Sequence, residues 1–478
     1  MVRVWAWWIP WSAVVALAST PPGSIDAFVA EALPASGAPG IAFAVVDHGA
    51  VEAGAQGEIL QGSGRALTPD TPFRIGSISK SFTAVLVMQL VEAGQVGLDD
   101  AIARHLSAFS DSPGAAITLR QLLSHTSGYA TLQGNDRHVD PPGSEDALAR
   151  QVDRIASWEP AYAPGTRWAY SNANYLVLGA LVQEVTGLDY ATCVTSRILE
   201  PLGMTHSFVA DGGVHEGMAV GHVPWFGRRR ALDDARTHRV IAPSGGVIAS
   251  ARDTARYLAV MMNGEDDILR AGSKARMMRP ASDVAPHYGL GWAIDPAEGT
   301  VSHTGVVPGI DTLAVMIPAE QRGVVVLVNG AGGLGFGETA GLFDGVRARA
   351  LGLEPVGTGG RWGRMALSGG WFLSPWLFLA GVAWAGTHRA AIRAKTGLSG
   401  AFSLWFPLLM TLVLAWVSVH LVPRLFGVSL ATLHRFQPDL ALAMVATAVT
   451  GVVWSLVRLG VHHSGRRGAS ASEGDAIG

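Results

Sequence analysis

The stretch that decides how this chain is interpreted is Phe73-Arg74-Ile75-Gly76-Ser77-Ile78-Ser79-Lys80. Ser77 precedes Lys80 by three positions, and apolar residues then recur at helical spacing from Phe82 to Leu90. Side chains three positions apart on a helix share one face, so the serine hydroxyl and the lysine amine are expected to meet. Helix N-termini also favour developing negative charge, which suits an attacking alkoxide. The stretch therefore predicts a helix that begins at a nucleophilic serine.

Lysine usage strengthens this interpretation. The 35 lysines and arginines of the 478-residue chain include only three lysines, Lys80, Lys274 and Lys395. Arginine cannot lose its proton, whereas a lysine in a suitable environment can. A lysine three residues after a serine, in a chain that otherwise uses arginine, therefore favours a role in proton transfer. The alternative from the motif alone is a solvated helix lysine.

Strand patterns lie at both ends of the central region, with a mainly helical middle. Residues 40–47 predict a buried strand that turns at His48-Gly49 into a second strand. The clearest helix of the middle runs from Asn172 to Val185. Later strands are expected at 289–294, 301–303, 313–317 and 324–328, the last two joined by a hairpin loop at 318–323. This order predicts an α+β domain in which the N-terminal hairpin joins a C-terminal antiparallel sheet.

Two further segments carry candidate site residues. Tyr170-Ser171-Asn172 directly precedes the middle helix and can present a phenol and an amide to a cleft. The phenol can exchange protons with the serine if nearby cations lower its pKa from about 10; the alternative is simple helix capping. His303-Thr304-Gly305 ends a short strand and is followed by Val306. A backbone N–H there can donate to an oxyanion, and the alternative is an ordinary exit from a strand.

The identities, order and spacing of these three motifs resemble the penicillin-recognising serine hydrolases, specifically the class C β-lactamase and esterase branch. The similarity extends over residues 40–345 and includes three more segments. These are Leu122-Leu123-Ser124-His125-Thr126-Ser127-Gly128, Pro201-Leu202-Gly203-Met204 and Tyr288-Gly289-Leu290-Gly291-Trp292. The resemblance implies a β-lactamase/transpeptidase-like domain, in which an antiparallel sheet is flanked by helices and joined to a helical lobe.

The resemblance also implies a role for each candidate residue. Ser77 would be the acylated nucleophile. Lys80 and Tyr170 would share the base and acid roles, and which of the two is the base is left open. Asn172 would position the substrate near the third motif, His303 and Gly305. The oxyanion hole would consist of the backbone N–H groups of Ser77 and Val306. His125 is expected to be structural, bonding a neighbouring loop.

One departure from the family pattern concerns the third motif. β-Lactamases and penicillin-binding proteins carry lysine where this chain has His303, while histidine is frequent among esterase and D-aminopeptidase relatives. Histidine is at best partly charged at neutral pH, so weaker binding of a substrate carboxylate and poor β-lactam turnover are expected. A literal Lys395-Thr396-Gly397 lies between two apolar segments with no strand leading into it. We interpret that tripeptide as a decoy, a chance match to the family's third motif that is not part of the site.

The chain is 49% apolar and 15% charged, whereas soluble domains average about a quarter charged residues. The excess of apolar residues lies at the two ends of the chain. Residues 1–18 predict a signal peptide, with an uncleaved anchor as the alternative, and residues 24–355 form the hydrolase-like domain. Charge-free runs cover 365–387, 396–423 and 440–457. Transmembrane helices are therefore expected at 365–387, 400–422 and 440–457.

The basic residues around these segments predict the orientation. Arg389, Arg393 and Lys395 lie between the first two segments, and Arg466 follows the third. The positive-inside tendency places both regions in the cytoplasm, although Arg424 and Arg435 in the other loop weaken the contrast. An export signal gives the same orientation. We therefore expect a multi-pass protein of the cell membrane whose catalytic domain is extracytoplasmic.

Composition and motifs argue against several other functions. A net charge of −3 gives no sign of a nucleic-acid partner. The 15 histidines show no metal-ligand spacing, no glycine-x-serine-x-glycine elbow occurs, and no cofactor is expected. The predicted function is a membrane-anchored serine hydrolase that acts through a Ser77 acyl-enzyme on an ester or amide of a small molecule or peptide, as an esterase, D-aminopeptidase or β-lactamase-like enzyme. The alternative is a non-catalytic penicillin-binding-like sensor, because three spans exceed what tethering requires.

Overall fold

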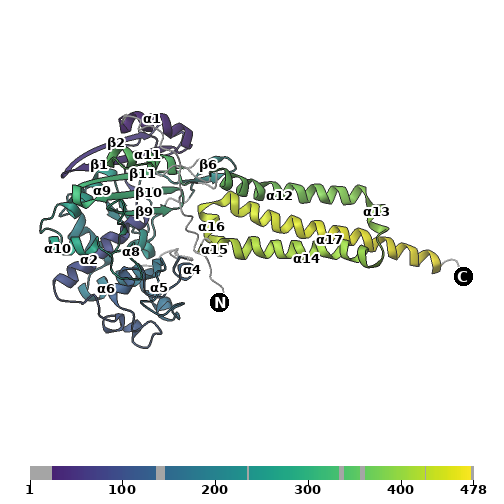
Figure 1. The fold of residues 1–478 in the computed structure, drawn as a ribbon, viewed down its shortest axis with the longest axis horizontal. Helices are drawn as coiled ribbons and strands as arrows, with labels where there is room; N and C mark the ends of the chain where they lie inside the picture. The colour runs from purple at the N-terminus through teal and green to yellow at the C-terminus, as the bar shows by residue number, and fades with distance from the viewer. Residues whose placement is uncertain are drawn as a thin grey trace.

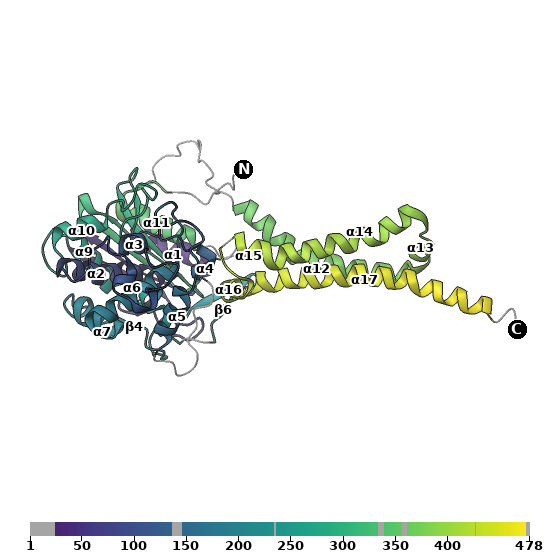
Figure 2. The same ribbon diagram turned by 90° about the horizontal axis from the view of Figure 1, so that it is seen from below.

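The computed structural model describes residues 24–135, 146–233, 236–332, 339–355, 361–425 and 427–474. An α+β body, residues 24–355, stands at one end, and a bundle of long helices, residues 361–474, projects from it (Figures 1 and 2). The signal peptide predicted at 1–18 lies outside the described residues.

The body is organised around a six-stranded antiparallel sheet with the strand order β2-β1-β11-β10-β9-β8. β1 pairs with β11 from Ile41 opposite Val328 to Asp47 opposite Arg322. This pairing confirms the prediction that the N-terminal hairpin joins the C-terminal strands. The strands are β1 (Gly40–Asp47), β2 (Ala50–Gly57), β8 (Ala293–Asp295), β9 (Thr300–Val307), β10 (Ile310–Ile317) and β11 (Arg322–Val328).

Helices cover both faces of this sheet. On one face, α1 (Ile25–Ser36) and α11 (Ala340–Leu351) pack through a cluster that includes Val29, Val326 and Val346. On the other face, α9 (Ala251–Met262) contacts β1 and β11. Because β11 is buried from both sides, it is almost entirely valine and leucine rather than alternating apolar and polar.

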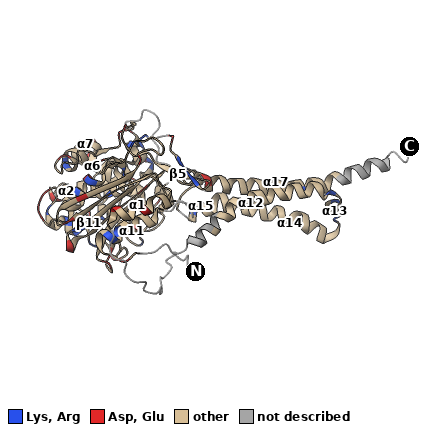
Figure 3. Cartoon of the chain, turned by 90° about the horizontal axis from the view of Figure 1, so that it is seen from above, with Lys and Arg blue, Asp and Glu red and all other residues tan. Residues whose placement is uncertain are grey.

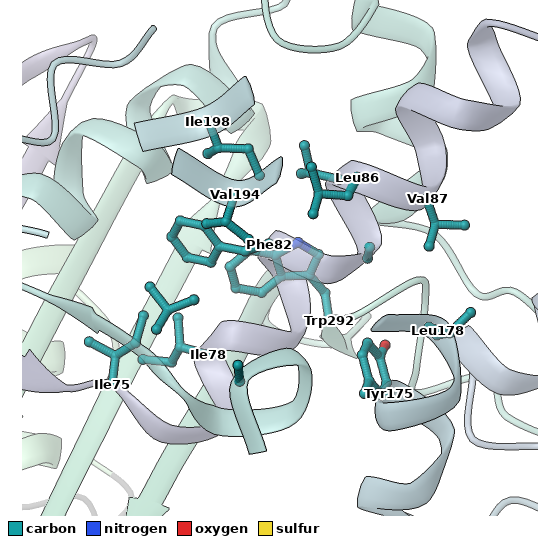
Figure 4. Close-up of a cluster of buried hydrophobic side chains, with 14 of the residues drawn as sticks. Ile75, Ile78, Phe82, Leu86, Val87, Tyr175, Leu178, Val194, Ile198 and Trp292 are labelled. Carbon is teal, nitrogen blue, oxygen red and sulfur yellow. The ribbon is translucent and has the colours of Figure 1, made fainter. Parts of the chain in front are cut away.

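A helical lobe packs beside the sheet around α2 (Ser79–Glu92), which is buried on nearly all of its surface. From Phe82 onward its buried residues are mostly apolar, as is typical of a helix enclosed on most of its surface. Phe82 of α2 stacks on Tyr257 with ring centroids 4.2 Å apart, and Figure 4 shows Phe82 and Leu86 among side chains of other elements. The lobe also contains α3 (Leu119–Leu123), α5 (Ala147–Ala156), α6 (Asn172–Thr186), α7 (Tyr190–Val194) and α8 (Ala242–Gly245).

Shorter elements complete the body. A small sheet has the order β3-β7-β4, and β5 and β6 form a hairpin. Their bounds are β3 (Phe73–Arg74), β4 (Phe208–Val209), β5 (His222–Trp225), β6 (Arg228–Ala231) and β7 (Val247–Ala249). The short helices are η1 (Gly76–Ile78), η2 (Ile102–Arg104), η3 (Ser107–Phe109), α4 (Thr131–Asn135), η4 (Thr195–Leu199), η5 (Arg239–Ile241), α10 (Ala271–Met277) and η6 (Pro318–Glu320).

The strand predicted at 289–294 is largely wrong, because β8 spans only Ala293–Asp295. The two glycines of this segment form a tight turn instead. Gly291 has φ +82°, and a Cβ on Gly289 would lie 2.2 Å from the Met277 carbonyl oxygen. The glycines therefore permit a close backbone approach rather than an extended strand.

The bundle consists of α12 (Arg361–Thr387), α13 (Arg389–Arg393), α14 (Gly397–Trp416), the π-helical turn η7 (Val417–Leu421), α15 (Val422–Leu425), α16 (Leu430–Phe436) and α17 (Pro438–Gly474). Both α12 and α14 pack along α17. Within the described residues, Gly397–Leu425 and Pro438–Ser464 are long and apolar enough to cross a membrane. α12 occupies the first predicted span but does not meet the same criterion, since glycine, serine, tryptophan and proline dilute its apolar residues. Two such helices, rather than clearly three, are therefore supported.

Candidate active site

Ser77 lies in η1, directly after β3 and before α2. The preceding Gly76 has φ +57°, and a Cβ there would lie 2.9 Å from the backbone nitrogen of Val306. Glycine therefore permits both the left-handed backbone and the close approach of β9. As a result, Ser77 and Val306 lie side by side, and both line the same cavity.

Gly305 holds this junction together from the side of the sheet. A Cβ on Gly305 would lie 2.0 Å from the Ile75 carbonyl oxygen and 2.2 Å from Thr312 Oγ1. The Thr312 hydroxyl donates to the same Ile75 carbonyl at 2.9 Å. The third sequence motif is thus placed against the first by backbone contacts that only glycine allows.

Lys80 lies beneath Ser77, fully buried. Its Nζ is 3.0 Å from Ser77 Oγ and donates to the Ser244 carbonyl of α8 at 2.6 Å. Across the described ranges no carboxylate pairs with it. Burial lowers the pKa of Lys80 well below its usual value. A neutral amine in this position can donate one N–H to Ser244 and accept the proton of Ser77 with its lone pair.

Tyr170 is the third member of the cluster. Its ring centroid is 4.9 Å from Lys80 Nζ, and its phenol interacts with the Ser77 hydroxyl. Burial raises the pKa of Tyr170 above its ordinary value, against a smaller opposing effect of the Ser77 hydrogen bond. The condition set from the sequence, that nearby cations lower this pKa, is not met, because burial also disfavours the charged form of Lys80. A neutral phenol beside the serine is a proton donor.

His125 fixes the loop that carries Tyr170. Its Nδ1 accepts hydrogen bonds from the Ser171 backbone N–H and from Asn174 Nδ2, both at 3.1 Å. The imidazole ring lies 4.4 Å from the Tyr170 ring. His125 adopts φ +59°, an unusual backbone for a side chain other than glycine. These contacts agree with the structural role expected for this histidine.

Asn172 lines the cavity at the start of α6. Its backbone N–H donates to Asn135 Oδ1 at 3.1 Å. Its own Oδ1 is buried and has no hydrogen-bond partner in the described part of the chain. Buried polar atoms are rarely left unsatisfied, so this oxygen is available to a donor on a bound molecule.

His303 does not face the cavity. It is 5% exposed and is not among the lining residues, whereas Thr304 and Val306 point to the opposite, exposed face of the strand. Its Nδ1 is 2.7 Å from the Thr304 carbonyl and must donate, so its Nε2 accepts from the Tyr288 hydroxyl at 3.0 Å. Burial lowers the pKa of His303 from 6.5 to about 3. The imidazole is therefore neutral at neutral pH, within the limit of partial charge expected from the sequence.

The cavity above Ser77 has a volume of about 540 Å³, within the usual range for small-molecule sites. Of the predicted site residues, Ser77, Asn172 and Val306 line it, and Lys80, Tyr170 and His303 lie behind its wall. Two features were missed from sequence. One is the Ser244 carbonyl that binds Lys80. The other is a set of lining residues from β6 and α16, among them Arg230 and Arg435; Arg435 was noticed only as a weak point in the charge pattern.

The literal Lys395-Thr396-Gly397 lies between α13 and α14, at the end of the bundle far from the body (Figure 1). The Lys395 amine bonds the Ser403 hydroxyl of α14. The tripeptide is thus remote from the serine cluster, in agreement with its interpretation as a decoy.

The antiparallel sheet, the helical lobe and the serine–lysine–tyrosine cluster between them define a β-lactamase/transpeptidase-like protein. A model of the Beta-lactamase family matches residues 25–348. The chain belongs to this family.

Three similar proteins illustrate the breadth of the family. Penicillin-binding protein 4 of Amycolatopsis lactamdurans is 30% identical over 315 residues, which cover 61% of this chain and 81% of that protein. The octameric penicillin-binding protein homologue from Pyrococcus abyssi aligns with a TM-score of 0.60 at 26% identity, covering 69% of this chain and 77% of that one. D-alanine carboxypeptidase AmpC from Burkholderia cenocepacia aligns with a TM-score of 0.55 at 24% identity, over 69% and 97% of the two chains. This last likeness shows the fold alone.

Proposed function

We propose that this protein is a serine hydrolase that forms an acyl-enzyme on Ser77 from an ester or amide. The observation that carries the proposal is the 3.0 Å contact between Ser77 Oγ and the buried Lys80 amine. Burial lowers the pKa of this amine, which provides a base of the kind that nucleophilic catalysis by serine requires. Proteins of this fold family are generally serine hydrolases.

The geometry supports the following steps. Lys80 accepts the proton of Ser77 as Oγ attacks the substrate carbonyl carbon. The backbone N–H groups of Ser77 and Val306 stabilise the oxyanion. The carbon–oxygen or carbon–nitrogen bond then breaks, and the Tyr170 phenol donates a proton to the leaving group and regains one from Lys80. Water hydrolyses the acyl-enzyme by the reverse transfers, which releases the acid and restores Ser77.

The substrate class follows from the neutrality of His303. A neutral imidazole behind the strand gives no fixed charge at the third motif, where a β-lactam carboxylate would be held, and charge-assisted hydrogen bonds are about twice as strong as neutral ones. We therefore expect turnover of uncharged short-chain esters or amides and poor turnover of penicillins, although one relative is named as a penicillin-binding protein and another as a D-alanine carboxypeptidase.

The experiment compares kcat/KM of the purified protein for a neutral short-chain ester, a D-amino-acid peptide and a chromogenic cephalosporin. The proposal predicts measurable turnover of the ester or the peptide and poor turnover of the cephalosporin. Cephalosporin hydrolysis near ~10⁶ M⁻¹s⁻¹ or above, an efficient value for enzymes in general, would contradict this substrate class.

We also propose that the helices at 365–387, 400–422 and 440–457 anchor the protein in the cell membrane with the body outside, after export through residues 1–18. Two observations support this. The bundle exposes large apolar side chains such as Trp376, Phe402 and Trp405, which lipid would cover. The basic residues around α13 lie at the end of the bundle opposite to the body (Figure 3). Protease added to intact spheroplasts should release the body; protection until the membrane is permeabilised would reverse the orientation.

A second candidate function is a membrane-coupled sensor that is acylated or occupied without turnover. It is favoured by one observation, that residues of the loop between the last two long helices line the cavity above Ser77. The two candidates differ in stoichiometry. A hydrolase releases many equivalents of product from a neutral ester, whereas a sensor stops at about one.

A further inference from the structure

The cavity above Ser77 is bounded partly by the bundle. Its lining includes Thr432, His434, Arg435 and Phe436 of α16 and Pro438, the first residue of α17. We call residues 427–438 the α16 segment. It lies where the body meets the bundle (Figures 1 and 2). The catalytic cleft therefore has one wall made by the segment that connects two long apolar helices.

Specific contacts hold this wall against the body. The Phe226 backbone N–H, in the β5–β6 turn, donates to Asp439 Oδ2 at the start of α17 at 3.0 Å. The Phe226 ring packs edge-on against Phe372 of α12, with centroids 5.7 Å apart. A Cβ on Gly427 would lie 2.8 Å from Thr131 Cγ2 of α4. Three separate contacts thus join the body to the bundle near the cleft.

The mouth of the cleft is basic. Arg230, Arg236, His434 and Arg435 line it and are exposed or partly so, with Asp233 as the acidic residue among the lining side chains. Arg435 forms no ion pair with any described residue, and the Arg230 guanidinium lies 4.1 Å from the Trp225 ring centroid. Guanidinium groups suit phosphate because their planar N–H fork matches its oxygens. The charge therefore favours an anionic group, and a phosphate in particular, at the mouth of the cleft.

We propose, building on the hydrolase and the membrane orientation proposed above, that the cleft takes its substrate from the outer leaflet: an ester or amide on a phosphate-bearing lipid. The mouth lies at the body end of the apolar helices, at the level where lipid headgroups begin. The lipid phosphate binds beside Arg435 and Arg230 while its carbonyl reaches Ser77. The Ser77 oxygen forms the acyl bond, the bond from the carbonyl to the lipid breaks, and the lipid leaves with a proton before water frees the acid.

The test uses the full chain in vesicles of digalactosyldiacylglycerol, a neutral lipid without phosphate, and three fluorogenic esters with the same acyl group. One ester is neutral and soluble, one is soluble and bears a phosphate, and one bears the same phosphate on a lipid tail within the vesicle. The variant is Arg435→Gln. The matched control is Arg424→Gln, at an exposed arginine of α15, which lies at the same end of the bundle as α16, and this arginine does not line the cavity.

For the wild type, kcat/KM should be highest for the lipid-borne phosphate ester. Arg435→Gln should reduce its preference over the neutral ester roughly tenfold, the size of one charge-assisted hydrogen bond, and Arg424→Gln should leave this preference unchanged. An unchanged preference in Arg435→Gln would overturn the proposal. Equal use of the soluble and lipid-borne phosphate esters would overturn it too, because recognition would then extend to free phosphate groups. No hydrolysis of any ester by the wild type would instead contradict the hydrolase function on which the proposal rests.

Discussion

Two lysines are buried in the body, and their surroundings differ. Lys274 of α10 donates to the Val260 carbonyl and to Asn263 Oδ1, each at 2.8 Å, and pairs with Asp267 at 2.8 Å. Lys80 of α2 meets Ser77 Oγ and the Ser244 carbonyl, and no carboxylate pairs with it in the described ranges. One ammonium is therefore compensated by an acid, and the other is not.

The difference separates a structural lysine from a reactive one. Removing a charge from water is costly unless an opposite charge or enough hydrogen bonds replace the lost hydration. Lys274 has these partners. Lys80 does not, so burial lowers its pKa and favours the neutral amine. A residue that lowers stability in this way persists where function needs it.

The largest expected effect is that of Ser77→Ala, because it removes the atom that the Lys80 amine activates. Hydrolysis of a neutral ester should fall by at least about 10⁴-fold, and labelling by a fluorophosphonate probe should be lost. Ser110→Ala, at an exposed serine outside the cavity, is the control and should keep both. Undiminished labelling of the Ser77 variant would place the nucleophile elsewhere.

Exchanging each buried lysine for arginine tests the comparison directly. Lys80→Arg introduces a permanent charge and cannot cycle a proton, so kcat should fall by about 10³-fold, within the range for lost general-base catalysis. Lys274→Arg can keep its ion pair with Asp267 and should retain activity within a few-fold. Similar losses of kcat in the two variants, with both proteins folded, would remove the distinction.

Lys80→Met should stabilise the folded protein while it inactivates the enzyme. The pKa of Lys80 is lower in the folded state than its unfolded value of about 10.4. The unfolded state then binds more protons between these two values, so the stability of the wild type rises with pH across that window. The variant should therefore unfold at a higher temperature than the wild type at pH 7, and the difference should shrink above pH 10. A lower midpoint at pH 7 would contradict the uncompensated burial of Lys80.

The smallest effect is expected for His303. Because its pKa is lowered from 6.5 to about 3, kcat/KM for a neutral ester should show no inflection near pH 6.5. His303→Ala leaves the Tyr288 hydroxyl without its partner and should lower the free energy of unfolding by about 1–3 kcal/mol. His303→Gln can retain a hydrogen bond and should cost less. A rate inflection near pH 6.5 that disappears in His303→Gln would show that the imidazole titrates.

Local spacing explains what the sequence could predict of the site. The contact between Ser77 and Lys80 requires only that the two residues lie three positions apart at the start of a helix. The structure contains this contact. The pairing of β1 with β11 follows from two strongly apolar strands at the two ends of one domain. The placement of Tyr170 beside this pair came from the resemblance to a family, since no local pattern connects residues so far apart.

Long-range packing accounts for the parts that were missed. The Ser244 carbonyl accepts a hydrogen bond from Lys80, 164 positions away in the sequence. Every residue has a backbone carbonyl, so the residue type does not indicate such a contact. The burial of His303 depends on which face of β9 the helical lobe covers, so its neutrality needed the structure. Arg435 weakened the charge pattern of the membrane segments, and its place at the cleft becomes visible only when the bundle meets the body.

The neutrality of Lys80 can be measured by NMR, because the chain has only three lysines. With lysine labelled by ¹³C at Cε, the full chain in detergent should give three signals whose shifts report protonation. One signal should titrate well below the ordinary lysine value of about 10.4 and should be absent from Lys80→Met, while the other two remain. Three signals that all titrate near 10.4 would contradict the neutral Lys80 base.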